Sequence, residues 1–244
     1  MIRTSNPTLK DKIFEAASGT GVMTLGGTLL KTGVLFLLMV ATAIYGWQSA
    51  SMGVMLLGAI GGLILALVTS FKPDWSPVTA PLYALFKGLA VGAISAYYSF
   101  QLAKTQYAGA VPMAIMGTLL VLGVMLALYS LRIIRVTKVF STVVIVATAC
   151  IALLYLFTFF GSMIWPGLAS MGIYGSGPIG LVFSAVVIVV AAMNLALDFQ
   201  TVENGIQMKA PRYMEWYAGF GLLVTLVWIY LEILRLIAKL SNRR

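Results

Sequence analysis

Apolar residues occur in long, nearly uninterrupted blocks along the chain, separated by short segments that hold most of the charged residues. Each block is close to the roughly 20 residues that a helix needs to cross a hydrocarbon core of about 30 Å. Strands of a membrane barrel would instead alternate apolar and polar residues over about 10 residues, so the pattern excludes a barrel. The pattern predicts seven spanning helices, at residues 32–49, 52–71, 79–100, 108–131, 139–162, 178–199 and 215–238.

The composition places the chain among integral membrane proteins. Hydrophobic residues make up 61% of its 244 residues, charged residues make up 9%, and the mean hydropathy is +0.99. The connections are short, and neither a repeat nor a low-complexity stretch is present, so we expect one all-α bundle. The predicted parts are a cytoplasmic N-terminal arm at 1–31, a seven-helix transmembrane domain at 32–238 and a basic C-terminal tail at 239–244.

The placement of lysine and arginine predicts the orientation of the chain, because short cytoplasmic loops carry an excess of both. Ten of these residues fall on one side of the predicted helices, together with the N-terminus, and we expect that side to be cytoplasmic. They are Arg3, Lys10, Lys12, Lys31, Lys72, Arg132, Arg135, Lys138, Lys209 and Arg212. The opposite loops contain only Lys104. The C-terminal tail lies outside if the last segment crosses the membrane and inside if it re-enters, and the length of that segment favours crossing.

The formal net charge of +9 does not indicate nucleic acid. The basic residues flank the predicted helices and form no single patch, so they indicate contact with the lipid bilayer. Lys87 lies within a predicted helix, where a lysine normally extends its ammonium group to the membrane surface. The sequence has no histidine and one cysteine, Cys150. An intrachain disulfide is therefore excluded, the usual ligands of zinc and haem are missing, and we expect no cofactor.

Pairs of glycines stand four residues apart in the second and third predicted helices. They are Gly58 with Gly62, and Gly88 with Gly92. Small residues at this spacing let a neighbouring helix approach closely. We therefore expect the two pairs to mark helix contacts rather than a ligand site.

The most informative polar residue is Asp198, which follows the apolar run 181–197 in a chain with only 7 acidic residues. A carboxylate near the end of a spanning helix is costly to keep charged, so it is a candidate functional group. Asn194 and Thr201 lie at helical spacing from Asp198, and the three residues form one stripe. The alternative is a structural role for Asp198 at the inner membrane surface.

A second polar stripe lies in the last predicted helix, where Thr225, Glu232 and Arg235 recur at helical spacing. A hairpin between the last two helices would bring the two stripes face to face. A carboxylate in a poorly hydrated site holds a proton more tightly, and a second carboxylate nearby strengthens this effect. Once deprotonated, Asp198 would offer calcium a hard oxygen ligand. Glu232 and Arg235 also fit a self-paired surface charge, because they are three residues apart.

Several segments, spread almost from end to end, resemble a bacterial branch of the Bax inhibitor-1/YccA family. They include Arg3–Pro7, Met23–Thr24, Gly27–Thr28, Lys31–Thr32, Thr79–Leu85, Gly175–Gly180, Tyr213–Tyr217 and Gly221–Trp228. The resemblance implies a seven-helix bundle with the last helix near its centre. It also implies a pH-sensitive calcium leak that is controlled by two aspartates, one at the end of the sixth helix and one within the seventh.

The match to those site residues is partial. Asp198, followed by Phe199 and Gln200, resembles the family's first aspartate. Thr225 occupies the position of the second aspartate, and threonine cannot ionise in the same way. Glu232 lies two turns further along, roughly 10 Å at 1.5 Å per residue, so it replaces that aspartate only if the site shifts. Lys72 corresponds loosely to a basic latch of the family, and Arg235 is a second candidate basic partner.

We therefore expect a cation leak in a bacterial inner membrane, with calcium as the ion and a carboxylate between the last two helices as the proton sensor. The alternative is a regulatory protein that binds another membrane protein, as some bacterial relatives do with the membrane-anchored protease FtsH. Ile13, Phe14 and Val22 of the N-terminal arm would then form the docking segment. An intramembrane aspartyl protease needs two paired aspartates, so we expect no enzymatic activity.

Overall fold

The structure is a computed structural model that describes residues 21–164 and 175–242, apart from the side chains of residues 159 and 163. The helices of this part are α2 (Leu25–Ser49), α3 (Met52–Phe71), the 3-10 turn η1 (Pro73–Trp75), α4 (Ser76–Leu102), α5 (Ala110–Ser130), α6 (Lys138–Ile164), α7 (Pro178–Gln207) and α8 (Met214–Ser241). Within the described residues, seven helices are long and apolar enough to cross a membrane. The predicted fold class is therefore confirmed.

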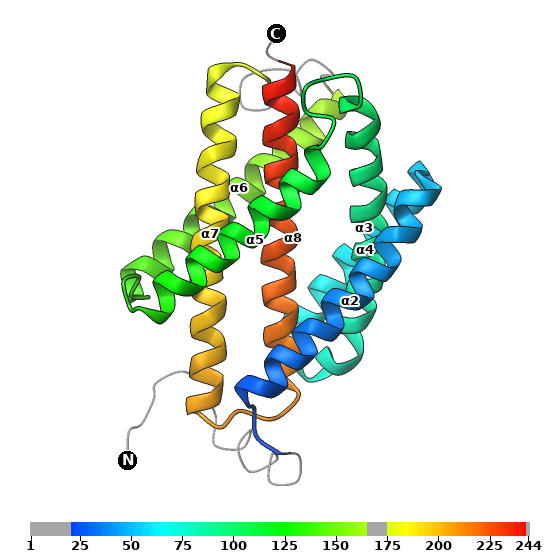
Figure 1. Cartoon of the computed structure of the whole chain (residues 1–244). Helices are drawn as coiled ribbons and strands as arrows, with labels where there is room; N and C mark the ends of the chain where they lie inside the picture. The colour runs from blue at the N-terminus through cyan, green and yellow to red at the C-terminus, as the bar shows by residue number, and fades with distance from the viewer. Residues whose placement is uncertain (1–20, 165–174, 243–244) are drawn as a thin grey trace.

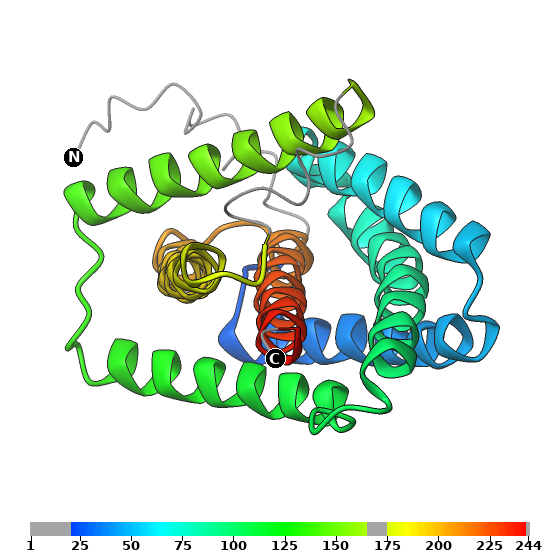
Figure 2. The same ribbon diagram turned by 90° about the horizontal axis from the view of Figure 1, so that it is seen from above.

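Helix α8 stands at the centre of the bundle, surrounded by the other helices (Figures 1 and 2). It packs against α2, α4, α5 and α7. Leu223, Ile229 and Leu234 of α8 are completely buried, so other helices and not lipid surround this part of α8. The central position that the family resemblance implies for the last helix is confirmed.

Most of the helices are longer than the apolar pattern predicts, and the largest extensions are those of α2 and α7. α2 begins at Leu25 rather than at residue 32, because the Thr24 side chain accepts a hydrogen bond from the Gly27 amide and caps the helix. The predicted boundary of the N-terminal arm at residue 31 therefore falls inside α2. α7 runs on to Gln207 rather than ending at residue 199, and its added turns are polar. Hydropathy marks the part of a helix that lipid surrounds, and not the part that continues beyond it.

Three of the four paired glycines mark close helix contacts, as predicted, whereas a Cβ at Gly62 would meet Lys87 only at an ordinary 3.6 Å. A side chain at Gly58 would overlap the backbone of α4 at Phe86 and Ala90. A side chain at Gly92 would overlap the backbone carbonyl of Ala43 in α2. Gly88 meets α2 in the same way at Met39. α4 thus lies between α2 and α3 at backbone contact, which only residues without a Cβ allow.

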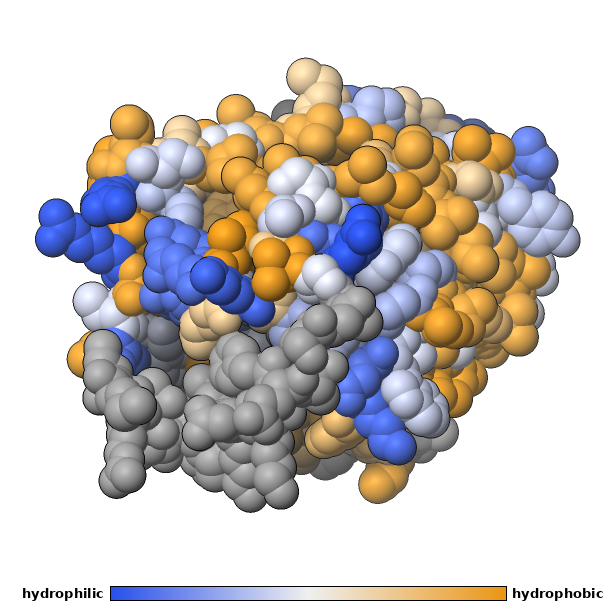
Figure 3. Space-filling model, turned by 90° about the horizontal axis from the view of Figure 1, so that it is seen from below, coloured by the Kyte–Doolittle hydropathy of each residue, from blue (hydrophilic) through white to orange (hydrophobic). Residues whose placement is uncertain are grey.

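The chain crosses the bundle an odd number of times. In Figure 1, α2 begins at the lower end and α8 ends at the upper end. α8 is one continuous helix of 28 residues, so the last segment crosses and does not re-enter. The connections at 72–75, 131–137 and 208–213 all lie towards the lower part, which we call the basic end. Hydrophilic side chains gather there, and hydrophobic side chains cover the flanks (Figure 3).

Candidate functional site

A hydrogen bond between α7 and α8 joins the two polar stripes. The Thr225 hydroxyl donates to Asp198 Oδ2 at 2.6 Å. Thr225 is buried, and Asp198 is partly buried. The structure therefore brings together the residue that resembles the family's first aspartate and the threonine at the position of the second.

Asp198 and Thr225 border a pocket of about 360 Å³ between α3, α7 and α8. Ala66 and Ser70 contribute from α3, and Tyr217 contributes from α8. Ser70 is in the last turn of α3 and Tyr217 in the first turn of α8, so the pocket lies in the half of the bundle nearest the basic end. No other carboxylate borders it.

The Thr225 hydroxyl has two acceptors within reach. Besides Asp198, the backbone carbonyl oxygen of Gly221 lies 3.2 Å away. A hydroxyl has one proton to donate and can accept as well. When Asp198 is charged, Thr225 donates to it. When Asp198 is protonated, it can donate to the Thr225 oxygen while the hydroxyl proton turns to Gly221. A hydrogen bond between Asp198 and Thr225 is therefore available in both protonation states.

Neither candidate basic partner contacts Asp198. In the described ranges 21–164 and 175–242, Asp198 has no basic group within ion-pair distance. The Lys72 ammonium lies 4.5 Å from the centre of the Trp75 ring. Arg235 pairs with Glu232 at 2.8 Å. A deprotonated Asp198 therefore accepts a hydrogen bond from the Thr225 hydroxyl, and its charge is otherwise compensated only by an ion or water that enters the pocket.

Glu232 belongs to a different cluster, two turns further along α8. Its Oε2 accepts hydrogen bonds from Tyr155 of α6 and from Arg235, each at 2.8 Å. Glu232 is only 1% exposed. The predicted pairing with Arg235 is confirmed; the glutamate of the pair is buried, whereas the Arg235 side chain is 33% exposed. Glu232 does not border the Asp198 pocket. The site has therefore not shifted along α8, as it would have to if Glu232 replaced the second aspartate.

Asn194 also points away from the pocket. Its side-chain amide donates to Thr148 of α6 at 2.8 Å and to the Val190 carbonyl at 2.9 Å. It thus holds α6 against α7. Thr201, the third residue of that stripe, does border the pocket. Of the three residues of the predicted stripe, Asp198 and Thr201 therefore border the pocket and Asn194 does not.

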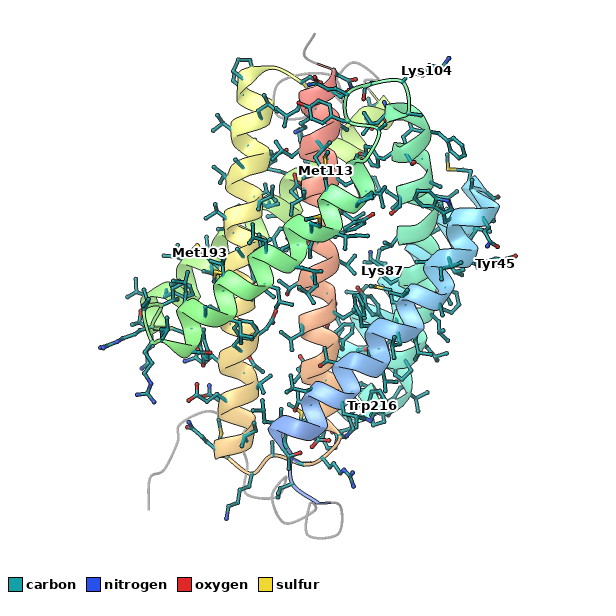
Figure 4. All side chains as sticks on the ribbon, in the orientation of Figure 1. Tyr45, Lys87, Lys104, Met113, Met193 and Trp216 are labelled. Atoms are coloured by element: carbon teal, nitrogen blue, oxygen red, sulfur yellow. The ribbon has the colours of Figure 1, made fainter. Side chains whose placement is uncertain are left out.

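Lys87 lies near the middle of its spanning helix. It is 14 residues from Pro73 and 15 from Leu102, the ends of its span, which is about 20 Å at 1.5 Å per residue. Its side chain lies against Gly62 of α3. Figure 4 shows it at mid-height, between Lys104 at one end and Trp216 at the other. Lys87 is partly exposed, and the extension of its ammonium group to the membrane surface stays a prediction.

A second polar cluster, which the sequence reasoning missed, joins the start of α2 to the start of α8. Glu215 forms an ion pair with Lys31. Its other oxygen accepts from the Thr24 amide at 2.9 Å and from the Thr24 hydroxyl at 3.0 Å. Glu215 is 1% exposed. In the sequence, Glu215 was recognisable only as a rare acidic residue at the start of an apolar block. We call the cluster of Glu215, Lys31 and Thr24 the Glu215 clasp.

The described residues contain no group of three or more histidine, cysteine or acidic side chains that could hold a metal ion. Calcium takes 6–8 oxygen ligands in protein sites. The Asp198 pocket is lined by one carboxylate and by the hydroxyl-bearing residues Ser70, Thr201, Tyr217 and Thr225. Of the residues predicted to dock a partner, Ile13 and Phe14 lie outside the described residues, and Val22 forms a β-bridge with Pro211.

Comparison with known proteins gives one match. A family model described as "Bax inhibitor 1 like" matches residues 6–242. No curated protein and no solved structure matches the chain. The matched range includes all seven spanning helices and both residues of the Asp198–Thr225 hydrogen bond.

Proposed function

The chain belongs to the Bax inhibitor 1 like family, and from this membership and the pocket around Asp198 we propose that it is a pH-sensitive calcium leak of a bacterial inner membrane. The observation that carries the proposal is a carboxylate inside a spanning helix that faces a pocket without a basic partner. Such a group is expensive to retain in a membrane unless it serves an ion or proton path. Calcium is the cargo here and not a resident cofactor.

The proposed gate is the protonation of Asp198. At low pH the protonated side chain exchanges hydrogen bonds with Thr225, carries no charge and gives a cation no reason to enter. At higher pH the carboxylate is charged and attracts a cation into the pocket from the basic end. Beyond the pocket, Val227 and Tyr230 of α8 are buried. This packing supports the proposal of a closed bundle, in which flux requires α8 to move relative to its neighbours.

The first test is calcium flux into dye-loaded liposomes that contain the purified protein, recorded from about pH 6 to pH 8, where a desolvated carboxylate titrates. For the wild type we expect flux that rises with pH. Asp198→Asn cannot ionise, and we expect severalfold lower flux at the upper pH together with a flat profile. Unchanged flux and unchanged pH dependence in this variant would show that Asp198 is not the sensor.

The matched control is Glu203→Gln, the same chemical change on the same helix. Glu203 is exposed and lies outside the Asp198 pocket, so we expect the pH profile of Glu203→Gln to match that of the wild type.

Tyr213, near the start of α8, does not titrate in this window. Burial and the neighbouring Asp74 raise the pKa of Tyr213 to about 12.

Thr225→Asp tests the partner position. The new carboxylate would face Asp198 across a contact of 2.6 Å, and two carboxylates at such a distance share one proton up to a higher pH. We therefore expect the rise in flux to move to higher pH and to become steeper. Thr225→Val keeps the shape of the side chain and removes the hydroxyl, so it separates loss of the hydrogen bond from gain of a charge. A Thr225→Asp profile identical to that of Thr225→Val would contradict the shared-proton mechanism.

The regulatory function remains the alternative prediction. No observation on the described residues favours it, because most of the predicted docking segment lies outside them.

A further inference from the structure

A groove distinct from the Asp198 pocket lies between α2, α5, α7 and α8, towards the basic end. Its volume is about 1000 Å³, at the upper end of the range for small-molecule sites, roughly 300–1,000 Å³. Most of its lining is aliphatic, including Leu25, Leu29, Leu122, Leu126, Leu222 and Leu226. Leu25, Leu29 and Leu126 are also exposed on the outer surface. Leu122, Leu126, Leu222 and Leu226 belong to the predicted spans, whereas Arg132 and Arg135 lie beyond them, so the groove runs from the apolar flank of the bundle to its basic end.

One rim of the groove is polar and basic. Arg132 and Arg135, in the connection between α5 and α6, both line it. Gln200 of α7 donates to the Val136 carbonyl at 3.2 Å and ties this connection to α7. Glu203 is the acidic residue of the rim, and the Tyr129 hydroxyl donates to it. Two guanidinium groups therefore stand beside one carboxylate that is already engaged.

Arg132 adopts a backbone conformation that favours glycine. Its φ is +57°, and its amide donates to the Tyr129 carbonyl at 3.0 Å, which ends α5. Glycine is the usual residue at such a helix end, because a Cβ is strained there. An arginine at this position gives up local stability. This cost is understandable if the side chain has a task at the rim.

We propose that the groove binds one anionic phospholipid, with an acyl chain along the leucines and the phosphate held by Arg132 and Arg135. Guanidinium groups pair with phosphate through two parallel hydrogen bonds and are the preferred side chains for that task. A phospholipid fits this groove because the groove is apolar and open to lipid, and because its rim at the level of the headgroups is basic. The inference does not depend on the proposed leak, because it uses neither Asp198 nor Thr225.

The test is native mass spectrometry of the purified protein with phosphatidylglycerol and with phosphatidylcholine, which differ in headgroup charge. For the wild type we expect one phosphatidylglycerol to be retained with a preference of about tenfold over phosphatidylcholine, as two charge-assisted phosphate contacts would give. Arg132→Gly and the double variant Arg132→Gln with Arg135→Gln should lose that preference. Leu126→Trp should reduce retention of both lipids, because the indole would occupy the groove.

Lys209→Gly is the matched control. Lys209 is also a basic residue of the basic end with a positive φ, +52°, but it does not line the groove. Both glycine variants remove one charge and relieve the same strain, so both should unfold at the wild-type temperature or slightly above. Only Arg132→Gly should lose the lipid preference.

Three results would overturn the proposal. The first is equal retention of the two lipids by the wild type, which would indicate a neutral lipid or unselective contact. The second is an equal loss of preference in Arg132→Gly and Lys209→Gly, which would indicate general surface charge. The third is retention of no lipid, with the groove instead occupied by a second copy of the chain in a dimer.

Discussion

Glu215→Gln is expected to lower the free energy of unfolding by about 3 kcal/mol, the lower end of the range for breaking a buried ion pair. The amide keeps the size of the side chain, which matters because Gly27 packs directly against the carboxylate. It removes the charge that Lys31 needs, and the Lys31 side chain is only 12% exposed. Unfolding of the purified protein in detergent, followed by heat or denaturant, measures the loss.

A double-mutant cycle separates the ion pair from the shape of the Glu215 clasp. Lys31→Met combined with Glu215→Gln leaves no buried unpaired charge, because the remaining partner Arg212 is 70% exposed, so we expect it to recover more than half of the stability lost by Glu215→Gln alone. Equal stability of Glu215→Gln and the wild type would mean that water, and not the clasp, neutralises Lys31. A double variant as unstable as the single one would assign the loss to the Thr24 contacts instead.

Gly92→Ala is expected to lower the free energy of unfolding by a similar amount, about 3 kcal/mol, the upper end of the usual cost of overpacking. The added Cβ would overlap the backbone carbonyl oxygen of Ala43. A backbone atom cannot turn aside as a side chain can, so α2 and α4 must separate. The same separation would disturb α8, which packs against both helices.

Gly123→Ala is the matched control for this prediction. Gly123 is an exposed residue of α5, and a Cβ there would meet nothing within 4 Å. Alanine is the better helix former, so we expect no loss and a gain of up to about 1 kcal/mol. If the two variants unfold alike, close approach at Gly92 is not what holds α2 against α4.

The contrast between Glu232 and Thr225 shows where sequence reasoning stopped. Both residues lie on α8 at helical spacing, and the pattern left open which of them accompanies Asp198. Their partners decide the question, because Thr225 meets α7 whereas Glu232 meets Tyr155 of α6. Spacing describes one helix, and the identity of a contact depends also on the rotation and height of the neighbouring helix.

The class of the protein, the seven helices and the close contacts at Gly58, Gly88 and Gly92 could all be predicted from the amino-acid sequence. The bilayer imposes a length and an apolar composition on each span, and a missing Cβ acts locally, so these properties can be recognised along the chain. The packing of the helices brings Thr24 to Glu215, 191 residues away, directs Glu232 to Tyr155 rather than to Asp198, and leaves a groove between four helices with two arginines on its rim. These features depend on how the helices pack around α8, and no short segment of the chain contains that information.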